Sequence, residues 1–193
     1  HPEGLAIVRR LVSDADVVKR RTLVAAGGAA PAIVDVESVG ASSLVSTGSQ
    51  VMHVTEVSAV VLADVTQPWP DSLAKDPSDP RRVYAGTVDG ILYASSNGGA
   101  SWTRLDPGFP SRGASLDDIL VTEKGEIYAS FWKIDGTGGG IARSVNRGQS
   151  FRMIGSGLEG EAVRGLARAA SNPRIFVAVT RTGVFRSIDE AES

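Results

Sequence analysis

The feature that most constrains the fold of this chain is an eight-residue frame that occurs twice. Residues 95–102 read SSNGGASW and residues 144–151 read SVNRGQSF, so both follow the pattern Ser-x-Asn-x-Gly-x-Ser-aromatic. A weaker copy, SIDEAES, covers residues 187–193, with Asp189 in the Asn position and Ala191 in the Gly position. The copies start 49 and then 43 residues apart. A repeat of this length indicates that one structural unit is used several times.

The segments around the frames have the alternation that is typical of β-strands. Residues 83–87, 127–131 and 175–179 alternate with a period of two and are rich in β-branched and aromatic side chains. Around the second frame, the pattern predicts four antiparallel strands, at 117–122, 126–132, 140–145 and 150–154. We therefore predict an all-β fold, a partial or small β-propeller with four antiparallel strands per blade. Its blades are expected at about 72–106, 117–154 and 162–193.

Residues 1–66 lack the frame but contain further strand-like runs, at 22–26, 31–37, 51–57 and 59–65. We predict a diverged β region there, one blade plus a closing strand, followed by the framed blades within 67–193. This gives few blades, since a propeller usually has about four to eight. The third frame is also incomplete, so its blade is predicted to lack an outer strand and to have an open edge. Three solutions stay open. A strand from 5–12 closes a small ring, another chain covers the edge and makes an oligomer, or the chain is part of a larger propeller.

The residue types in the frame predict a turn with a structural role. Ser, Asn and Asp side chains bond to nearby backbone N–H groups, and Gly adopts the positive φ that closes a tight loop. The final aromatic residue begins the next strand and is expected to point into the gap between neighbouring sheets. The frame holds no nucleophile–base pair and no metal geometry, so we assign it to the fold and not to chemistry.

The frame resembles the Asp-box, or bacterial neuraminidase repeat. That repeat occurs in sialidases, xyloglucan-hydrolysing glycosidases, sortilin-type receptors and the photosystem II assembly factor group. The resemblance covers residues 72–193 and implies a propeller whose boxes lie at the periphery, away from the ligand face. Both complete copies depart from the pattern by having Asn where Asp is usual. The matching residues are Ser95, Asn97, Gly99, Ser101 and Trp102, then Ser144, Asn146, Gly148, Ser150 and Phe151, then Ser187, Asp189 and Ser193.

Two small groups of residues are candidates for a functional site. A glycosidase needs two carboxylates about 5–10 Å apart, and Asp117 and Asp118 lie where an inner strand is predicted to begin. Adjacent strand residues point to opposite faces, however, so a strand start or turn cap is the competing interpretation. Trp132, Lys133 and Asp135 flank the GTGGG run and are candidates for a binding face. Packing between blades is the alternative for Trp132.

The composition narrows the class of function. A formal net charge of -2 argues against nucleic-acid binding. With no Cys and one internal His, we expect no metal and no cofactor, and no apolar run is long enough for membrane insertion. We predict a non-catalytic binding scaffold for a protein or glycan partner, extracytoplasmic or secreted from a bacterium, with a cytoplasmic location left open. The alternative that the resemblance implies is a glycoside hydrolase of the xyloglucanase-like or, less well supported, the sialidase-like type.

Overall fold

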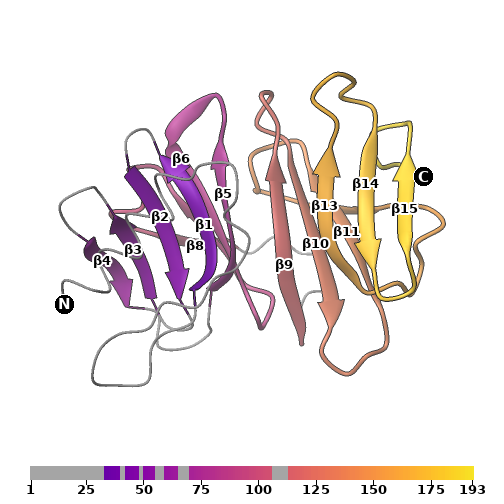
Figure 1. Cartoon of the computed structure of the whole chain (residues 1–193), viewed down its shortest axis with the longest axis horizontal. Coiled ribbons are helices and arrows are strands. Elements are labelled where there is room, and N and C mark those ends of the chain that lie inside the picture. Colours follow the sequence, from indigo (N-terminus) through magenta and orange to yellow (C-terminus); the bar gives the residue numbers. More distant parts are fainter. Residues whose placement is uncertain (1–32, 40–41, 48–49, 55–58, 65–69, 106–112) are drawn as a thin grey trace.

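The structure, a computed structural model, describes residues 33–39, 42–47, 50–54, 59–64, 70–105 and 113–193, with side chains from residue 70 onward. In this part of the chain the strands form four antiparallel sheets that follow one another in sequence (Figure 1). The first sheet contains β1 (Ile33–Val39), β2 (Ser42–Thr47), β3 (Gln50–Val54) and β4 (Ala59–Asp64). The second contains β5 (Pro70–Asp76), β6 (Asp79–Thr87), β7 (Leu92–Ser95) and β8 (Thr103–Leu105).

The third and fourth sheets differ in strand number. The third contains β9 (Ala114–Val121), β10 (Ile127–Lys133), β11 (Gly139–Ser144) and β12 (Arg152–Ile154). The fourth has three strands, β13 (Val163–Arg168), β14 (Phe176–Thr180) and β15 (Val184–Ser187). The first strands of successive sheets contact one another, β1 with β5, β5 with β9, and β9 with β13. Each sheet is therefore a blade whose first strand is innermost, as in a β-propeller.

Most of the strands predicted from the sequence occur close to their predicted positions. β9 is longer than predicted, because it begins at Ala114, and Ser115 pairs with Trp132 of β10. β2 was not predicted, because its Ser-rich sequence reads as a separator. In the structure β2 pairs on one side with β1 and on the other with β3, and such pairing outweighs weak strand propensity. The runs at 5–12 and 22–26 lie outside the described residues, and the division at residue 66 stays a prediction.

Two apolar clusters hold the last three sheets together. One lies between the second and third sheets and joins Tyr84 and Leu92 to Leu116, Ile127 and Phe131. The other lies between the third and fourth sheets. It contains Tyr128, Ile141, Val163, Phe176 and Ala178, and it includes the ring contact of Tyr128 with Phe176 at 4.6 Å. Each large side chain buried in these clusters contributes about 1.5–3 kcal/mol.

Each innermost strand carries an irregularity near one end. The pairing of β5 with β6 shifts between Pro70 and Ser72, and that of β13 with β14 shifts between Val163 and Gly165. In β9 the shift skips Asp117. Extra residues of this kind are β-bulges, which locally redirect side chains. Asp71, Asp117 and Arg164 therefore occupy equivalent bulge positions in three successive blades.

None of the described residues forms a helix with the length and apolar character needed to cross a bilayer.

Candidate functional site

The bulge in β9 builds a compact polar group around Asp117. The Trp132 Nε1–H donates a hydrogen bond to Asp117 Oδ1 at 2.8 Å, and Arg164 Nε lies 2.5 Å from Asp117 Oδ2. The Arg164 guanidinium carbon also lies 4.3 Å from the centre of the Trp132 ring, within the range of a cation–π contact. The Asp117 side chain is 2% exposed, whereas that of Arg164 is 40% exposed. In this group the buried carboxylate of Asp117 thus fixes the position of Arg164, whose guanidinium is partly exposed to solvent.

Asp118 has a different role from its neighbour. Its Oδ2 accepts a hydrogen bond from the backbone N–H of Leu166 in β13 at 2.8 Å. Both carboxylates therefore contact β13. Adjacent residues of a regular strand would point to opposite faces, but the bulge at Asp117 interrupts the regular alternation of β9. The interpretation of this pair as a strand start or turn cap is wrong. Both residues lie inside β9, which begins three residues before Asp117.

The remaining candidates lie at the tip of the β10–β11 hairpin. Lys133 is the last residue of β10, and its backbone N–H donates to the Gly138 carbonyl at 2.6 Å. Asp135 accepts hydrogen bonds from the hydroxyl and backbone N–H of Thr137, which hold the pKa of its carboxyl below the usual value. A Cβ on Gly138 would lie 2.7 Å from the carbonyl oxygen of Gly160. The glycine run therefore lets this hairpin pack closely against the following loop.

Arg164 is the functional candidate that sequence reasoning missed. No signal in the sequence marks it, because the bulges that hold Asp71, Asp117 and Arg164 appear only in the pairing of the strands. The same end of the fold holds a second contact of this kind, since Ser115 Oγ donates to Asp71 Oδ2 at 2.9 Å. A row of polar side chains therefore joins neighbouring innermost strands from blade to blade.

The three frames form the same hydrogen bonds. In the first, Ser95 Oγ accepts from the backbone N–H of Gly99 at 2.8 Å, and Asn97 Oδ1 accepts from the backbone N–H of Ser101 at 2.9 Å. The second frame repeats both bonds, at 2.9 and 3.0 Å, between the equivalent residues Ser144, Asn146, Gly148 and Ser150. In the third, Ala191 N–H donates to Ser187 Oγ and Ser193 N–H to Asp189 Oδ1, both at 3.0 Å. The turns are closed by these local bonds.

The backbone of the frames is equally uniform. The fourth and fifth positions have positive φ in all three copies, at Gly98 and Gly99, Arg147 and Gly148, and Glu190 and Ala191. The aromatic residues are half-buried. Trp102 packs with Leu73, Val83 and Ala85 of its own sheet, whereas Phe151 packs on the cluster between the second and third sheets. The frames thus lie at the outer edge of each sheet, whereas the Asp117 group lies at the inner edge, on the first strands.

The chemistry of the Asp117 group favours recognition over proton transfer. Both carboxylate oxygens already accept from Trp132 and Arg164, so the carboxylate has little capacity left for a substrate. The guanidinium of Arg164, by contrast, is 40% exposed, so the donors that face solvent can bind a planar anion or neighbouring hydroxyls. In residues 70–105 and 113–193, no group of three or more His, Asp or Glu side chains is arranged to hold a metal.

Comparison with solved structures settles the fold class. The chain is similar to a GH74 xyloglucanase from Xanthomonas campestris, with a TM-score of 0.64 and 18% sequence identity over 80% of this chain and 28% of the enzyme. It is also similar to YCF48 bound to D1 peptide, with a TM-score of 0.60 and 15% identity over 90% of this chain and 55% of YCF48. This chain is a small or partial β-propeller. The prediction of an all-β propeller fold is confirmed.

A third similar structure is a designed protein of nearly the same length. The computationally designed Ika4 protein matches with a TM-score of 0.60 and 15% identity over 86% of this chain and 96% of Ika4. No protein-family model and no curated protein matches the sequence. The structures to which the chain is similar include enzymes and proteins named for peptide binding or design, and at these identities they show the fold alone. The chain spans about a quarter of the length of the xyloglucanase.

Proposed function

We propose that this protein is a non-catalytic binding scaffold that presents the Asp117–Trp132–Arg164 group to a protein or glycan partner. The observation that carries the proposal is that both carboxylate oxygens of Asp117 are already engaged, one by a hydrogen bond from Trp132 and the other by an ion pair with Arg164. An arginine fixed by a buried carboxylate and an aromatic ring loses little side-chain freedom on binding, which favours affinity. The similarity to YCF48, a propeller described as bound to a D1 peptide, supports a protein partner.

The test is binding and turnover measured side by side. Calorimetric titrations would use xyloglucan oligosaccharides, a sialoside and a panel of peptides ending in a free carboxylate. We expect binding to one of these probes that falls about tenfold or more in Arg164→Gln, since a charge-assisted hydrogen bond is lost. Arg174→Gln is the matched control, because Arg174 precedes β14 at the far end of the sheet from Arg164. Equal binding by wild type and Arg164→Gln would contradict the proposed site.

The alternative function is glycoside hydrolysis, supported by the similarity in fold to GH74 xyloglucanases. It requires a pair of carboxylates, of which Asp117 and Asp118 are the candidates. Hydrolysis of a β-glucan or sialoside that disappears in Asp118→Asn or Asp117→Asn would overturn the binding-only function. Binding without turnover in the wild-type protein would leave the scaffold as the function.

We also propose that the frames are Asp-boxes with a purely structural role, and that the chain divides into a diverged β region at 1–66 and framed blades at 67–193. The repeated hydrogen bonds of the frames support the first point. An extracytoplasmic or secreted location is proposed on the similarity to the extracellular domain of the hybrid two component system BT4673 from B. thetaiotaomicron, which matches with a TM-score of 0.62 and 14% identity. Fractionation of cells that express the full reading frame tests the location.

A further inference from the structure

The interface between the third and fourth sheets contains an arginine surrounded by carboxylates. Tyr128 of β10 pairs with Arg143 of β11, and the guanidinium carbon of Arg143 lies 5.3 Å from the centre of the Tyr128 ring. That guanidinium binds Glu126 of its own sheet at 2.9 Å and Glu190 of the following frame at 3.2 Å. A cation therefore links carboxylates from two neighbouring sheets.

The interface between the second and third sheets has the same tyrosine, but the charges around it are reversed. Tyr84 of β6 pairs with Ala94 of β7, so a methyl group takes the place of the central guanidinium. Arg82 stands two residues before this tyrosine, where the third sheet has a glutamate. Arg147 stands at the fourth position of the following frame, where the third frame has the other glutamate. Two arginines thus replace two carboxylates, and the group between them is no longer a cation.

Both of these arginines act on the buried hydroxyl of Tyr84. Burial raises the pKa of Tyr84 and the charge of Asp76 adds to the rise, whereas Arg82 and Arg147 lower it. Arg147 reaches this interface along the β9–β10 turn, since a Cβ on Gly125 would lie 3.1 Å from Arg147 Nε. The Arg82 side chain is 27% exposed, and Arg147 is exposed. The hydroxyl therefore lies in a positive field that an anion can reach from solvent.

Three buried polar atoms at this interface form no hydrogen bond with the described residues. They are Tyr84 OH, Arg82 Nε and Asp76 Oδ2. Asp76 is fully buried, and its Oδ1 accepts from the backbone N–H and the hydroxyl of Ser78 at 2.8 and 2.6 Å. Its Oδ2 lies 3.9 Å from Arg82 Nε, which is beyond hydrogen-bond distance. Since buried polar groups are normally hydrogen-bonded, these atoms call for a ligand that both accepts and donates.

The chemistry of the surrounding groups selects a protonated oxyanion. Two guanidinium groups and a hydroxyl favour a ligand with several charged oxygens. The buried carboxylate favours a ligand that also keeps a proton. Inorganic phosphate has at least one P–OH group at neutral pH, whereas sulfate has none. A phosphate monoester has lost most of its second proton at neutral pH, since the pKa of that proton is about 6.

We propose that this interface binds inorganic phosphate, with Arg82, Arg147 and the Tyr84 hydroxyl as donors and Asp76 as the acceptor of the P–OH hydrogen bond. Bound phosphate links the second sheet to the third through charge-assisted hydrogen bonds. It has the same place between the sheets that Arg143 has in the next interface, with the opposite charge.

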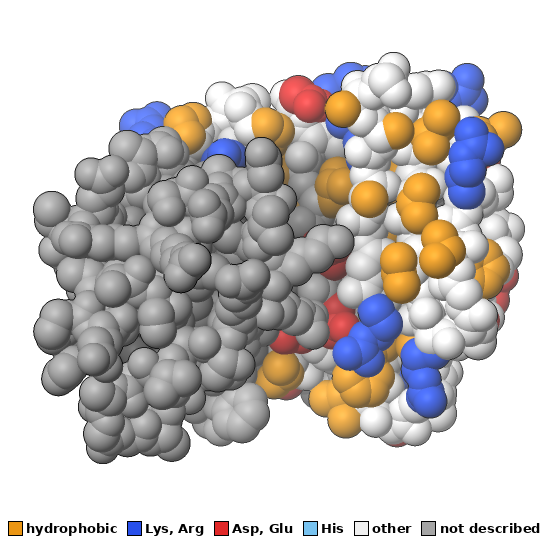
Figure 2. All heavy atoms as spheres, viewed as in Figure 1, with side chains coloured by type: hydrophobic (Ala, Val, Ile, Leu, Met, Phe, Trp, Pro, Cys, Tyr) orange, Lys and Arg blue, Asp and Glu red, His pale blue; other side chains and the backbone are white. Residues whose placement is uncertain are grey.

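The phosphate site is separate from the other surfaces of the molecule. It shares no residue with the Asp117 group, so the inference does not depend on the proposed function. It also lies apart from the sheet of β13–β15, over which Figure 2 shows exposed apolar side chains, among them Val184 and Phe185. Changes to the phosphate site therefore leave both of these surfaces intact.

The first test measures which anions bind. Isothermal titration at neutral pH and constant ionic strength would use inorganic phosphate, sulfate and phenyl phosphate. We expect saturable binding of phosphate, and binding of the other two that is about tenfold or more weaker, because neither donates to Asp76. Absence of saturable phosphate binding, or equal binding of sulfate or phenyl phosphate, would overturn the proposal.

The second test removes one donor. Arg147→Gln should weaken phosphate binding about tenfold, and its exposed position makes loss of folding an unsuitable explanation. Arg81→Gln is the matched control, because Arg81 stands beside Arg82 but is 78% exposed and pairs with Asp79. It should bind phosphate as the wild type does. Equal losses in both variants would reduce the effect to overall charge and contradict the site.

Two further variants test the acceptor and the reversal of charge. Asp76→Asn should let sulfate bind as tightly as phosphate, because the amide donates where the carboxylate accepts. A loss of both anions alike would limit Asp76 to a structural role and contradict the assigned ligand. The triple variant Arg82→Glu, Ala94→Arg and Arg147→Glu copies the arrangement of the third sheet and should lose phosphate binding while keeping the Tm of the phosphate-free wild type. Phosphate binding retained in this variant would show that the anion binds elsewhere.

Discussion

The β9–β12 sheet and the β13–β15 sheet have the same turn but different surroundings. β11 and β15 hold equivalent places, yet Ile141 is 1% exposed and its counterpart Val184 is 71% exposed. Ala142 is fully buried, whereas its counterpart Phe185 is 36% exposed. The hydrogen bonds of the frames at Ser144 and Ser187 are nonetheless alike. The turn therefore forms from its own residues, and only the packing depends on a fourth strand and a further neighbouring sheet.

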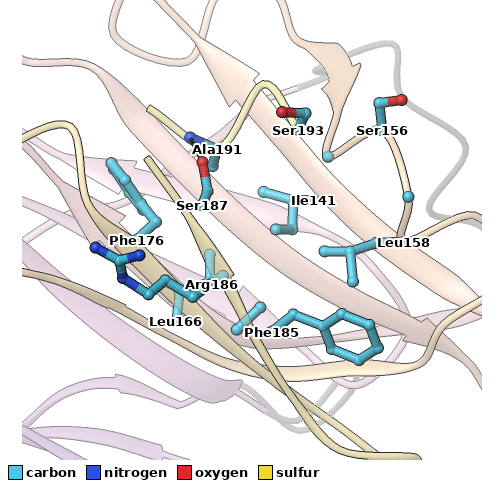
Figure 3. Close-up of a pocket in the computed structure, with 13 residues that line it drawn as sticks. Ile141, Ser156, Leu158, Leu166, Phe176, Phe185, Arg186, Ser187, Ala191 and Ser193 are labelled. Atoms are coloured by element: carbon cyan, nitrogen blue, oxygen red, sulfur yellow. Dashed lines mark hydrogen bonds between the residues drawn. The ribbon is translucent and has the colours of Figure 1, made fainter. Parts of the chain in front are cut away.

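The largest expected difference between the two sheets concerns their buried aromatic residues. Phe131→Ala removes a ring from the closed cluster between the second and third sheets and should lower the free energy of unfolding by about 4–5 kcal/mol. Phe176→Ala removes a ring that lines a solvent-open apolar groove of about 140 Å³ beside β15 (Figure 3), where water can refill the space, and should cost about 3 kcal/mol. Urea unfolding of both variants measures the difference. Equal losses would show that the groove is not open to solvent.

Arg143 joins the two sheets, and its removal should have the next largest effect. Its guanidinium, 11% exposed, donates to Glu126 at 2.9 Å, to Glu190 at 3.2 Å and to Glu192 at 2.8 Å. Arg143→Ala leaves three carboxylates without this partner and should cost about 2–3 kcal/mol. Arg152, which also binds Glu192 but is 56% exposed, is the control, and Arg152→Ala should cost less than about 1 kcal/mol. Similar losses for both variants would contradict the view that burial makes Arg143 the main link.

Exchange of Gly and Ala at the fifth frame position should have a larger effect in the third sheet than in the fourth. Gly148 has a φ of 85°, and a Cβ there would lie 2.8 Å from Leu105 Cδ1, so Gly148→Ala should cost about 1–2 kcal/mol. Ala191 already holds a φ of 62°, so Ala191→Gly relieves strain while it loses a buried methyl group of about 0.8 kcal/mol. We expect a change near zero. Thermal unfolding of the pair distinguishes them, and a large loss in Ala191→Gly would show that its methyl group is an essential part of the packing.

The smallest expected difference is a dependence on pH. Hydrogen bonds from Ser187 and Ser193 lower the pKa of Asp189 from 3.8 to about 2. The ionised carboxylate therefore supports the third frame above its ordinary pKa of 3.8, and this support is lost as the pH falls through about 2. The frames with Asn97 and Asn146 have no such group. A carbon-13 NMR titration of Asp189, with Asp189→Asn as control, measures it, and a pKa near 3.8 would contradict the hydrogen bonds of the third frame.

The sequence predicted some parts of the candidate site and missed others for a physical reason. Asp117, Asp118 and Trp132 could be singled out because they stand at the ends of the strands predicted from the sequence. Their roles could not be predicted, since the bulge in β9 shifts both carboxylates toward β13, and nothing local marks a bulge. Arg164 was missed because it lies 47 residues from Asp117 in the chain, and only the contact of innermost strands brings the two together.

The sequence by itself determined the turns, the strands that flank them and hence the blade as a unit. Those features depend on hydrogen bonds between residues two to four apart and on alternation along a strand, which are local properties. Only the tertiary structure decided which arginine pairs with Asp117, which carboxylates Arg143 binds, and that an apolar groove lies beside β15. Each of these depends on how one sheet packs against the next, and burial, charge pairing and open strand edges arise only when the sheets are assembled.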